Sequence, residues 1–425
     1  MARTAQTPRP PVAPTVCRIL LPFALGHFLS YLFRSINAVI AADLQHDVGL
    51  TASELGLLTA SYLFAFAIVQ LPLGLLLDRT GPRRAEAVLL MIAGAGSLVF
   101  AAGQEMASLT LGRVLIGLGV SACLMASIKA FSIWFQEDQL PTLNGYLFAF
   151  GGLGALMATA PVDMLLSITT WRMVFVGLAC LCVLVSLTIL FIVPEHNSTA
   201  TRHPLGKELS ELFVILRSRQ LWRFTPAAMF FPGAIMAVQG LWAGPWLRHV
   251  QGFDDSSTAL FLFLLALATT LGFAVWGLLI SRLTRLGFDS IHVIAVGLLF
   301  FSTSLGVLAW QPSLGNVVTW LLLGFFSSAG AMLYATFASQ FKKNLTGRAI
   351  TSLNLMVFIG AFLLQWGIGI IVELTTQLSV SSDPTFGYRF AFGLIVALQV
   401  VALLILLWPV RHQQQTDRSI ASDRD

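Results

Sequence analysis

Long hydrophobic runs separated by short polar turns dominate the pattern along this chain. Each run is close to the length of roughly 20 residues that a helix needs to cross a bilayer. Within lipid only helices and closed barrels satisfy their own backbone hydrogen bonds, so runs of this length indicate spanning helices. The pattern predicts an all-α membrane protein with twelve transmembrane helices, over residues 18–42, 55–77, 85–103, 108–134, 141–165, 172–193, 222–249, 257–280, 290–310, 315–341, 347–373 and 388–409.

The longest polar interruption lies in the middle of the chain, with six apolar segments on either side. Its second half predicts a surface helix with four apolar residues on one face: Leu209, Leu212, Phe213 and Leu216. The predicted parts are a cytoplasmic N-terminal tail (1–17), an N-terminal half (18–193), a cytoplasmic linker (194–221), a C-terminal half (222–409) and a cytoplasmic C-terminal tail (410–425).

Composition agrees with this picture, since 56% of the residues are hydrophobic and only 11% are charged, against about 25% charged in soluble domains. The Pro-rich N-terminus is expected to be disordered, and the run after it is too long for a cleaved signal peptide. The four cysteines fall in or beside apolar runs, which favours packing over disulfides or metal binding: Cys17, Cys123, Cys180 and Cys182.

The basic residues give an orientation. If both termini are cytoplasmic, all but six of the 25 lysines and arginines fall on the cytoplasmic side, the six being Arg34, Arg113, Lys129, Arg172, Arg248 and Arg389. This positive-inside bias predicts cytoplasmic termini and a multi-pass protein of the bacterial inner membrane. The basic residues are dispersed among turns, which does not suggest nucleic-acid binding.

A charged hairpin between the second and third segments has the most specific motif, over residues 74–84. Gly74 is expected to allow close helix contact, and Gly81-Pro82 predicts a tight turn. Asp78 is expected to pair with a basic group at the cytoplasmic face. A plain positive-inside loop is the alternative interpretation. A weaker copy, Gly277 to Arg282, follows the eighth segment with Ser281 in the place of the aspartate.

The hairpin resembles the signature loop of the major facilitator superfamily, G-x-x-x-D-R-x-G-R-R, which joins that family's second and third helices. The resemblance implies two pseudo-symmetric six-helix halves with substrate bound at mid-membrane between them. It also implies a role in conformational gating for Gly74, Asp78, Arg79, Gly81, Arg83, Arg84, Gly277 and Arg282.

Arg34 is the leading candidate for substrate binding. A charge within a spanning helix costs about 2.5–3.5 kcal/mol on insertion scales, so it needs a reason. Tyr31 to Arg34 resembles the first-helix arginine region of organophosphate antiporters and anion/cation symporters, which implies contact with an anionic substrate. Here Phe33 stands where the symporters commonly have an acid, and the seventh segment lacks the antiporters' second arginine. Snorkelling to the outer interface is the alternative.

Three further residues of the first half are candidates. Arg113 opens an R-x-x-x-G-x-G sequence with Gly117 and Gly119 that resembles the family's fourth-helix motif and implies proton coupling; an interface anchor is the alternative. Lys129 is predicted to attract the same anion as Arg34, or else to snorkel to the inner surface. His27 is a candidate proton carrier, or else a packing histidine.

Acids are scarce within the predicted spans. Asp163, Glu86 and Glu373 are expected near helix ends, so no carboxylate is expected at mid-helix. In the second half, Gln239, Trp242 and Trp246 share one face of a seventh helix, although an outer aromatic belt also explains the tryptophans. Further amide candidates for the substrate site are Gln340, Asn354 and Gln365.

The sequence contains no P-loop, no HExxH and no metal-spaced Cys/His cluster, so neither an enzyme nor a cofactor is expected. We therefore predict a monomeric secondary transporter in the lipid bilayer that moves a small organic anion by proton symport. One alternative is an exporter of neutral or cationic compounds. Another is a transporter-like sensor, which the missing mid-membrane acid also fits.

Overall fold

In the computed structural model, which describes residues 12–136, 139–195, 213–341, 345–378, 381, 383 and 385–408, all regular structure is helical. Eleven helical stretches are long and apolar enough to cross a membrane. A further span is the pair α1 (Val12–Ser35) and α2 (Asn37–Val48), bent by 47° where they meet. The expected all-α fold of twelve spans is confirmed for the described part of the chain.

The first half contains helices α1 to α8. A capping box, in which Thr51 and Glu54 bond each other's backbone, begins the long helix α3. This helix holds two spans, and α4 with α5 and α6 with α7 form one span each. The remaining bounds are α3 Ala52–Ala102, α4 Met106–Val120, α5 Cys123–Trp134, α6 Leu140–Met157, α7 Ala160–Leu166 and α8 Trp171–Ile192.

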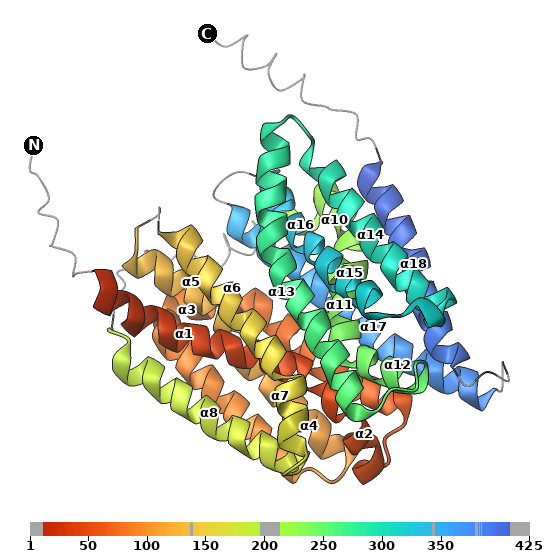
Figure 1. The fold of residues 1–425 in the computed structure, drawn as a ribbon. Helices are drawn as coiled ribbons and strands as arrows, with labels where there is room; N and C mark the ends of the chain where they lie inside the picture. Colours follow the sequence, from red (N-terminus) through yellow and green to blue (C-terminus); the bar gives the residue numbers. More distant parts are fainter. Residues whose placement is uncertain are drawn as a thin grey trace, which may run out of the picture.

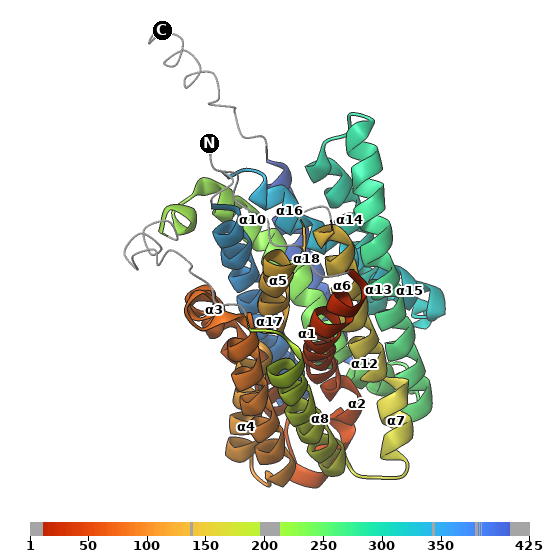
Figure 2. The same ribbon diagram turned by 90° about the vertical axis from the view of Figure 1, so that its left-hand side faces the viewer.

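The second half packs beside the first, with α17 against α3 at the boundary (Figures 1 and 2). Its helices are α10 Arg219–Phe230, α11 Pro232–Ala237, the π-helix η1 Val238–Trp242, α12 Ala243–His249, α13 Asp255–Arg285, α14 Ser290–Trp310, η2 Pro312–Leu314, α15 Val317–Ser327, η3 Ser328–Ala331, α16 Met332–Ala338, α17 Thr346–Gln377 and α18 Phe386–Leu407.

The charged hairpin is a kink inside α3. Gly81 has φ +76°, a left-handed conformation that glycine adopts without steric cost, so the predicted turn is confirmed. Arg83 donates to the carbonyl of Leu190 in α8, and both Arg83 and Arg84 pair with Glu195 just beyond α8. We call this the linker end of the bundle, and the opposite end, with the turn between α2 and α3, the far end.

The two halves hold together at the far end. A Cβ at Gly244 of α12 would strike the carbonyl of Ala38 in α2, so the backbones touch. Arg248 of α12 donates from Nη2 to the carbonyl of Val39, over 3.1 Å. Two further contacts join α3 to α17: the backbone N–H of Ser53 donates to Glu373 over 3.1 Å, and the Gly56 backbone lies against the Gln365 carbonyl.

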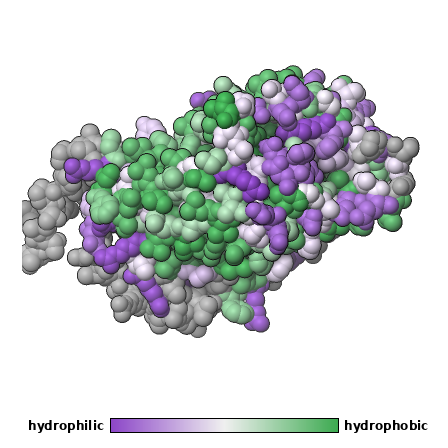
Figure 3. Space-filling view, turned by 90° about the horizontal axis from the view of Figure 1, so that it is seen from below, coloured by the Kyte–Doolittle hydropathy of each residue, from purple (hydrophilic) through white to green (hydrophobic). Residues whose placement is uncertain are grey.

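The exterior carries large hydrophobic side chains. Phe191 and Ile168 are each 81% exposed. Seen from below, a broad hydrophobic area adjoins a hydrophilic one (Figure 3). Contiguous apolar surface of this extent needs an apolar surrounding, and the spans identify it as lipid. The chain is a multi-pass membrane protein.

Candidate functional site

Arg34 lies at the end of α1, just before the bend into α2. Its guanidinium carbon is 4.6 Å from the ring centroid of Tyr31, 5.7 Å from that of Phe66 and 5.6 Å from that of Phe358. Its Nε is buried and has no hydrogen-bond partner among the described residues. The negative faces of aromatic rings attract a cation, so ring contacts surround this charge where an ion pair would be expected.

The rings around Arg34 come from both halves of the protein. Phe66 of α3 stacks on Phe358 of α17, with centroids 4.2 Å apart and planes 18° from parallel. Tyr334 of α16 is close enough to interact electrostatically with Arg34, and its hydroxyl donates to Asn354 Oδ1 over 2.8 Å. The arginine therefore faces the boundary between the halves, and the candidate amide Asn354 reaches this region through Tyr334.

Two buried groups fix the part of α1 that carries Tyr31 and Arg34. Arg113 of α4 donates from Nη1 to the carbonyl of Phe33 over 3.3 Å, and the Tyr62 hydroxyl donates to the carbonyl of Ser30 over 3.1 Å. Arg113 is fully buried, with its guanidinium 5.4 Å from the Tyr62 ring. The interpretation of Arg113 as an interface anchor is therefore wrong, and the residue positions α1. Its part in proton coupling stays a prediction.

The other candidates of the first half are His27, earlier on α1, and Lys129, on the neighbouring helix α5. His27 is 2% exposed, its ring is 4.9 Å from the Tyr31 ring, and neither ring nitrogen has a hydrogen-bond partner among the described residues. Lys129 is half-buried in α5, a helix that packs against α1. Both keep their predicted roles as proposals.

The seventh span departs from the expected single helical face. The π-helix η1 inserts a wider turn, which interrupts the α-helical spacing from Gln239 to Trp246. Trp242 donates its indole N–H to the carbonyl of Gln365 over 2.8 Å. Trp246 is fully buried and lies parallel to Phe392. The aromatic-belt interpretation of Trp246 is therefore wrong, and both tryptophans pack inside the protein.

Gln239 and Gln365 remain near the boundary. Gln239 is half-buried beside Gly240, whose Cβ position is 3.3 Å from the carbonyl of Arg34 and 3.9 Å from Gln365 Oε1. The Gln365 side chain is fully buried, and neither of its polar atoms has a hydrogen-bond partner among the described residues. An unpaired buried amide costs free energy, so Gln365 is suited to bind a polar ligand.

The gating candidates are only partly described. A Cβ at Gly74 or at Gly277 would meet nothing within 4 Å, so the expected close helix contact at Gly74 is wrong in this conformation. Arg79 and Arg282 are exposed. The Asp78 side chain lies outside the described residues, so its pairing with a basic group stays a prediction. Linker residues 196–212 also lie outside them, so the surface helix is not tested there.

Glu86 is the residue that sequence reasoning placed wrongly. The apolar run begins at residue 85, so Glu86 was expected at a helix end; it is instead completely buried in α3. Neither of its carboxyl oxygens has a hydrogen-bond partner of ordinary geometry among the described residues, and the weak thiol donor of Cys123 faces them. Among the same residues, no group of three His, Cys, Asp or Glu side chains has the arrangement of a metal site.

A comparison with protein families identifies this architecture. The model of the Major Facilitator Superfamily matches residues 23–365. The chain belongs to this superfamily. This major facilitator protein and its named relatives are transporters and not enzymes, as expected.

The individual relatives share about a quarter or less of their residues with this chain. The chain is 24% identical over 326 residues to a probable sulfoacetate transporter of Cupriavidus necator, covering 72% of this chain and 76% of the relative. It is 21% identical over 411 residues to the hexuronate transporter of Escherichia coli, covering 89% and 92%. A bacterial homologue of the lysosomal transporter Spinster, solved facing inward and unoccupied, superposes with a TM-score of 0.76 at 17% identity over 93% of this chain and 97% of that chain.

Proposed function

We propose that this major facilitator protein is a secondary transporter that moves a small organic anion across the bacterial inner membrane by alternating access. The observation that carries the proposal is the environment of Arg34. Its permanent cation lies at the boundary of the halves against three aromatic rings, without an ion pair among the described residues. A bound anion supplies the charge that the rings cannot.

The surroundings of Arg34 supply the remaining parts of a binding site. A guanidinium binds a carboxylate or sulfonate with two parallel hydrogen bonds. The buried amide of Gln365 and the Tyr334–Asn354 pair add hydrogen-bonding groups from the second half. Lys129 adds positive charge on the predicted cytoplasmic side. The relatives named for sulfoacetate and hexuronate support an acid as the substrate.

The contacts between the halves support alternating access. At the far end, the halves are joined by contacts of Arg248, Gly244 and Ser53. At the linker end, the contacts of Arg83 and Arg84 stay within the first half. The positive-inside bias supports a cytoplasmic position for the linker end. We infer that this conformation is closed to the outside and that the anion leaves toward the cytoplasm.

Counterflow in proteoliposomes tests the proposal. Vesicles loaded with unlabelled sulfoacetate or galacturonate are expected to take up the labelled form of the same anion, since exchange needs only a binding site that alternates between the two sides. Uptake of labelled choline under the same conditions, with no anion exchanged, would favour the exporter of cationic compounds. Saturable anion binding without exchange would favour the sensor.

A further inference from the structure

The buried acid Glu86 is not used by the site around Arg34. It lies on α3 just beyond the hairpin turn at Gly81 and is 0% exposed. Its Oε1 occupies the space that a Cβ would fill at Gly26 of α1, so the carboxyl group is pressed against the α1 backbone. Only a glycine at position 26 permits this contact.

No cation compensates Glu86 in the described part of the chain. On α5, the thiol of Cys123 faces the carboxyl group, and Cys182 of α8 is close enough to interact electrostatically with that thiol. On α1, the ring of His27 packs instead against Gly151 of α6. The nearest basic residues along α3, Arg83 and Arg84, contact Leu190 and Glu195.

An ionised carboxylate is strongly disfavoured in such a place. Burial removes its hydration, and among the described residues no cation replaces that hydration and the only donor that faces the carboxyl group is the weak thiol of Cys123. The neutral acid loses far less on burial. This conformation, with Gly26 packed on the carboxyl group, therefore requires a proton on Glu86.

We propose that Glu86 is the proton-carrying group of this transporter. The proposal rests on the proposed anion transport, and it assigns proton coupling to Glu86 in place of the sequence candidate His27. When α1 and α3 separate at Gly26, water reaches the carboxyl group; its O–H bond breaks, the proton passes to water and a carboxylate remains. Gly26 and Arg34 lie on the same helix, about 12 Å apart at helical rise. Movement of α1 at Glu86 is therefore transmitted to the anion site.

Two assays on Glu86→Gln separate coupling from transport. The amide keeps the size of the protonated acid but cannot release a proton. We expect wild-type uptake to be stimulated by an acidic outside, and we expect the purified variant to retain anion counterflow and to lose that stimulation. Cys123→Ala is the matched control: it removes the titratable neighbour and should keep that stimulation.

Two further measurements complete the test. Glu86→Asp, which retains a titrating group, should keep gradient-driven uptake at a reduced rate. The melting temperature of wild type should fall between about pH 6 and about pH 9 more than that of Glu86→Gln, because only wild type loses the buried proton. This comparison requires only folded protein.

The outcomes are distinguishable. If Glu86→Gln accumulates the anion in response to a proton gradient as wild type does, Glu86 only packs and the inference is wrong. If wild type exchanges anions but ignores the gradient, coupling at Glu86 is wrong while anion transport stands. If wild type exchanges no anion at all, the proposed function itself fails.

Discussion

At the scale of single residues, the main feature is Arg34, a cation that has no ion pair among the described residues. Tyr31, Phe66 and Phe358 surround the guanidinium of Arg34, and such ring contacts contribute about 0.5–2 kcal/mol each. Acidic partners at this position would compete with a substrate for the arginine. Aromatic partners stabilise the cation without adding a negative charge that would compete with an anion for it.

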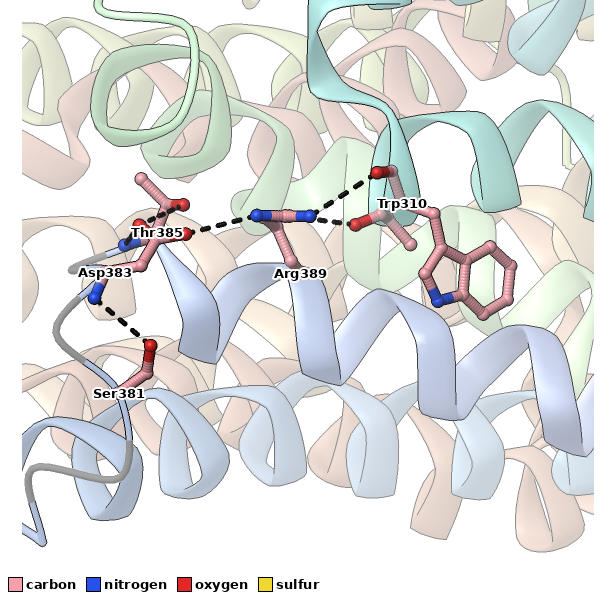
Figure 4. A network of polar contacts seen from close by, with 6 residues as sticks. Trp310, Ser381, Asp383, Thr385 and Arg389 are labelled. Carbon is pink, nitrogen blue, oxygen red and sulfur yellow. Dashed lines mark hydrogen bonds and ion pairs between the residues drawn. The ribbon is translucent and has the colours of Figure 1, made fainter.

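A second residue-scale network allows a prediction about pH. Arg389 bonds Asp383 and the carbonyl of Trp310, and Asp383 also accepts from Thr385 (Figure 4). The hydrogen bonds from Thr385, and then the charge of Arg389, hold the pKa of Asp383 below its ordinary value. This carboxylate therefore stabilises the fold above its ordinary pKa of about 4 and loses that effect as pH falls through the lowered pKa.

Asp383→Asn should consequently lower the melting temperature at neutral pH, with the difference from wild type shrinking below about pH 4. Thr385→Val, which removes the hydroxyl donor, should reduce this pH dependence. A difference between Asp383→Asn and wild type that stays constant across the acid range would show that Asp383 is not stabilised in this way.

Sequence reasoning found part of the candidate site and missed the rest for a physical reason. Arg34 and Tyr31 are one turn apart on a single helix, so local spacing was enough to link them. Phe66, Phe358 and Tyr334 come from other helices and look like ordinary apolar residues of a membrane protein. Helix packing within the first half brings Phe66 to the arginine, and the packing of the two halves brings Phe358 and Tyr334.

At the scale of elements, α4 packs closely on α3. A Cβ at Gly117 would strike the carbonyl of Tyr62, the residue whose hydroxyl holds α1 at Ser30. The backbones of α3 and α4 therefore touch at Gly117 of the fourth-helix motif. Because Gly117 contacts Tyr62 and Tyr62 holds α1 at Ser30, this contact also helps to determine where Arg34 lies on α1.

We therefore expect Gly117→Ala to destabilise the protein by about 1–3 kcal/mol through overpacking and to weaken anion binding. Gly177→Ala is the matched control on α8, because a Cβ there meets nothing within 4 Å. It should be neutral or stabilising by up to about 1 kcal/mol. Thermal unfolding in detergent measures both, and equal melting temperatures would show that α3 and α4 are not tightly packed at Gly117.

The elements differ in how far the sequence predicted them. Spanning helices follow from hydropathy, because lipid exposure requires long apolar runs. The bend between α1 and α2, the π-helix η1 and the burial of Trp246 depend on contacts with neighbouring helices. Hydropathy does not depend on which helices pack together, so it cannot predict these features. The burial of Glu86 was missed for the same reason.

At the scale of the whole molecule, the halves are joined at the far end. Arg248 connects them, since its Nε pairs with Asp255 over 2.8 Å and its Nη2 donates to Val39 of the first half. Removing a hydrogen bond from a charged group costs about 1.5–3 kcal/mol. Because the contact exists only when the far end is closed, its loss should favour conformations open at that end.

Spin labels at the exposed positions Gln104 and Gln311 can detect this shift in a Cys17→Ser, Cys180→Ser background. Arg248→Ala should add a longer component to the distance distribution. Asp255→Asn keeps the bond to Val39 and should have a smaller effect. An unchanged distribution in Arg248→Ala would show that this arginine does not hold the halves together.

The most direct test of the account is equilibrium binding of an anion to purified Arg34 variants. Sulfoacetate and galacturonate are the first probes, and Arg172→Ala is the control, because Arg172 contacts the Trp171 ring at 4.2 Å, apart from the site. We predict that Arg34→Ala loses about 2–5 kcal/mol of binding free energy or more.

Arg34→Lys keeps the charge without the two-point geometry and should bind only weakly, while Arg172→Ala binds as wild type does. A folded Arg34→Ala protein that binds the anion with unchanged affinity would contradict the central claim.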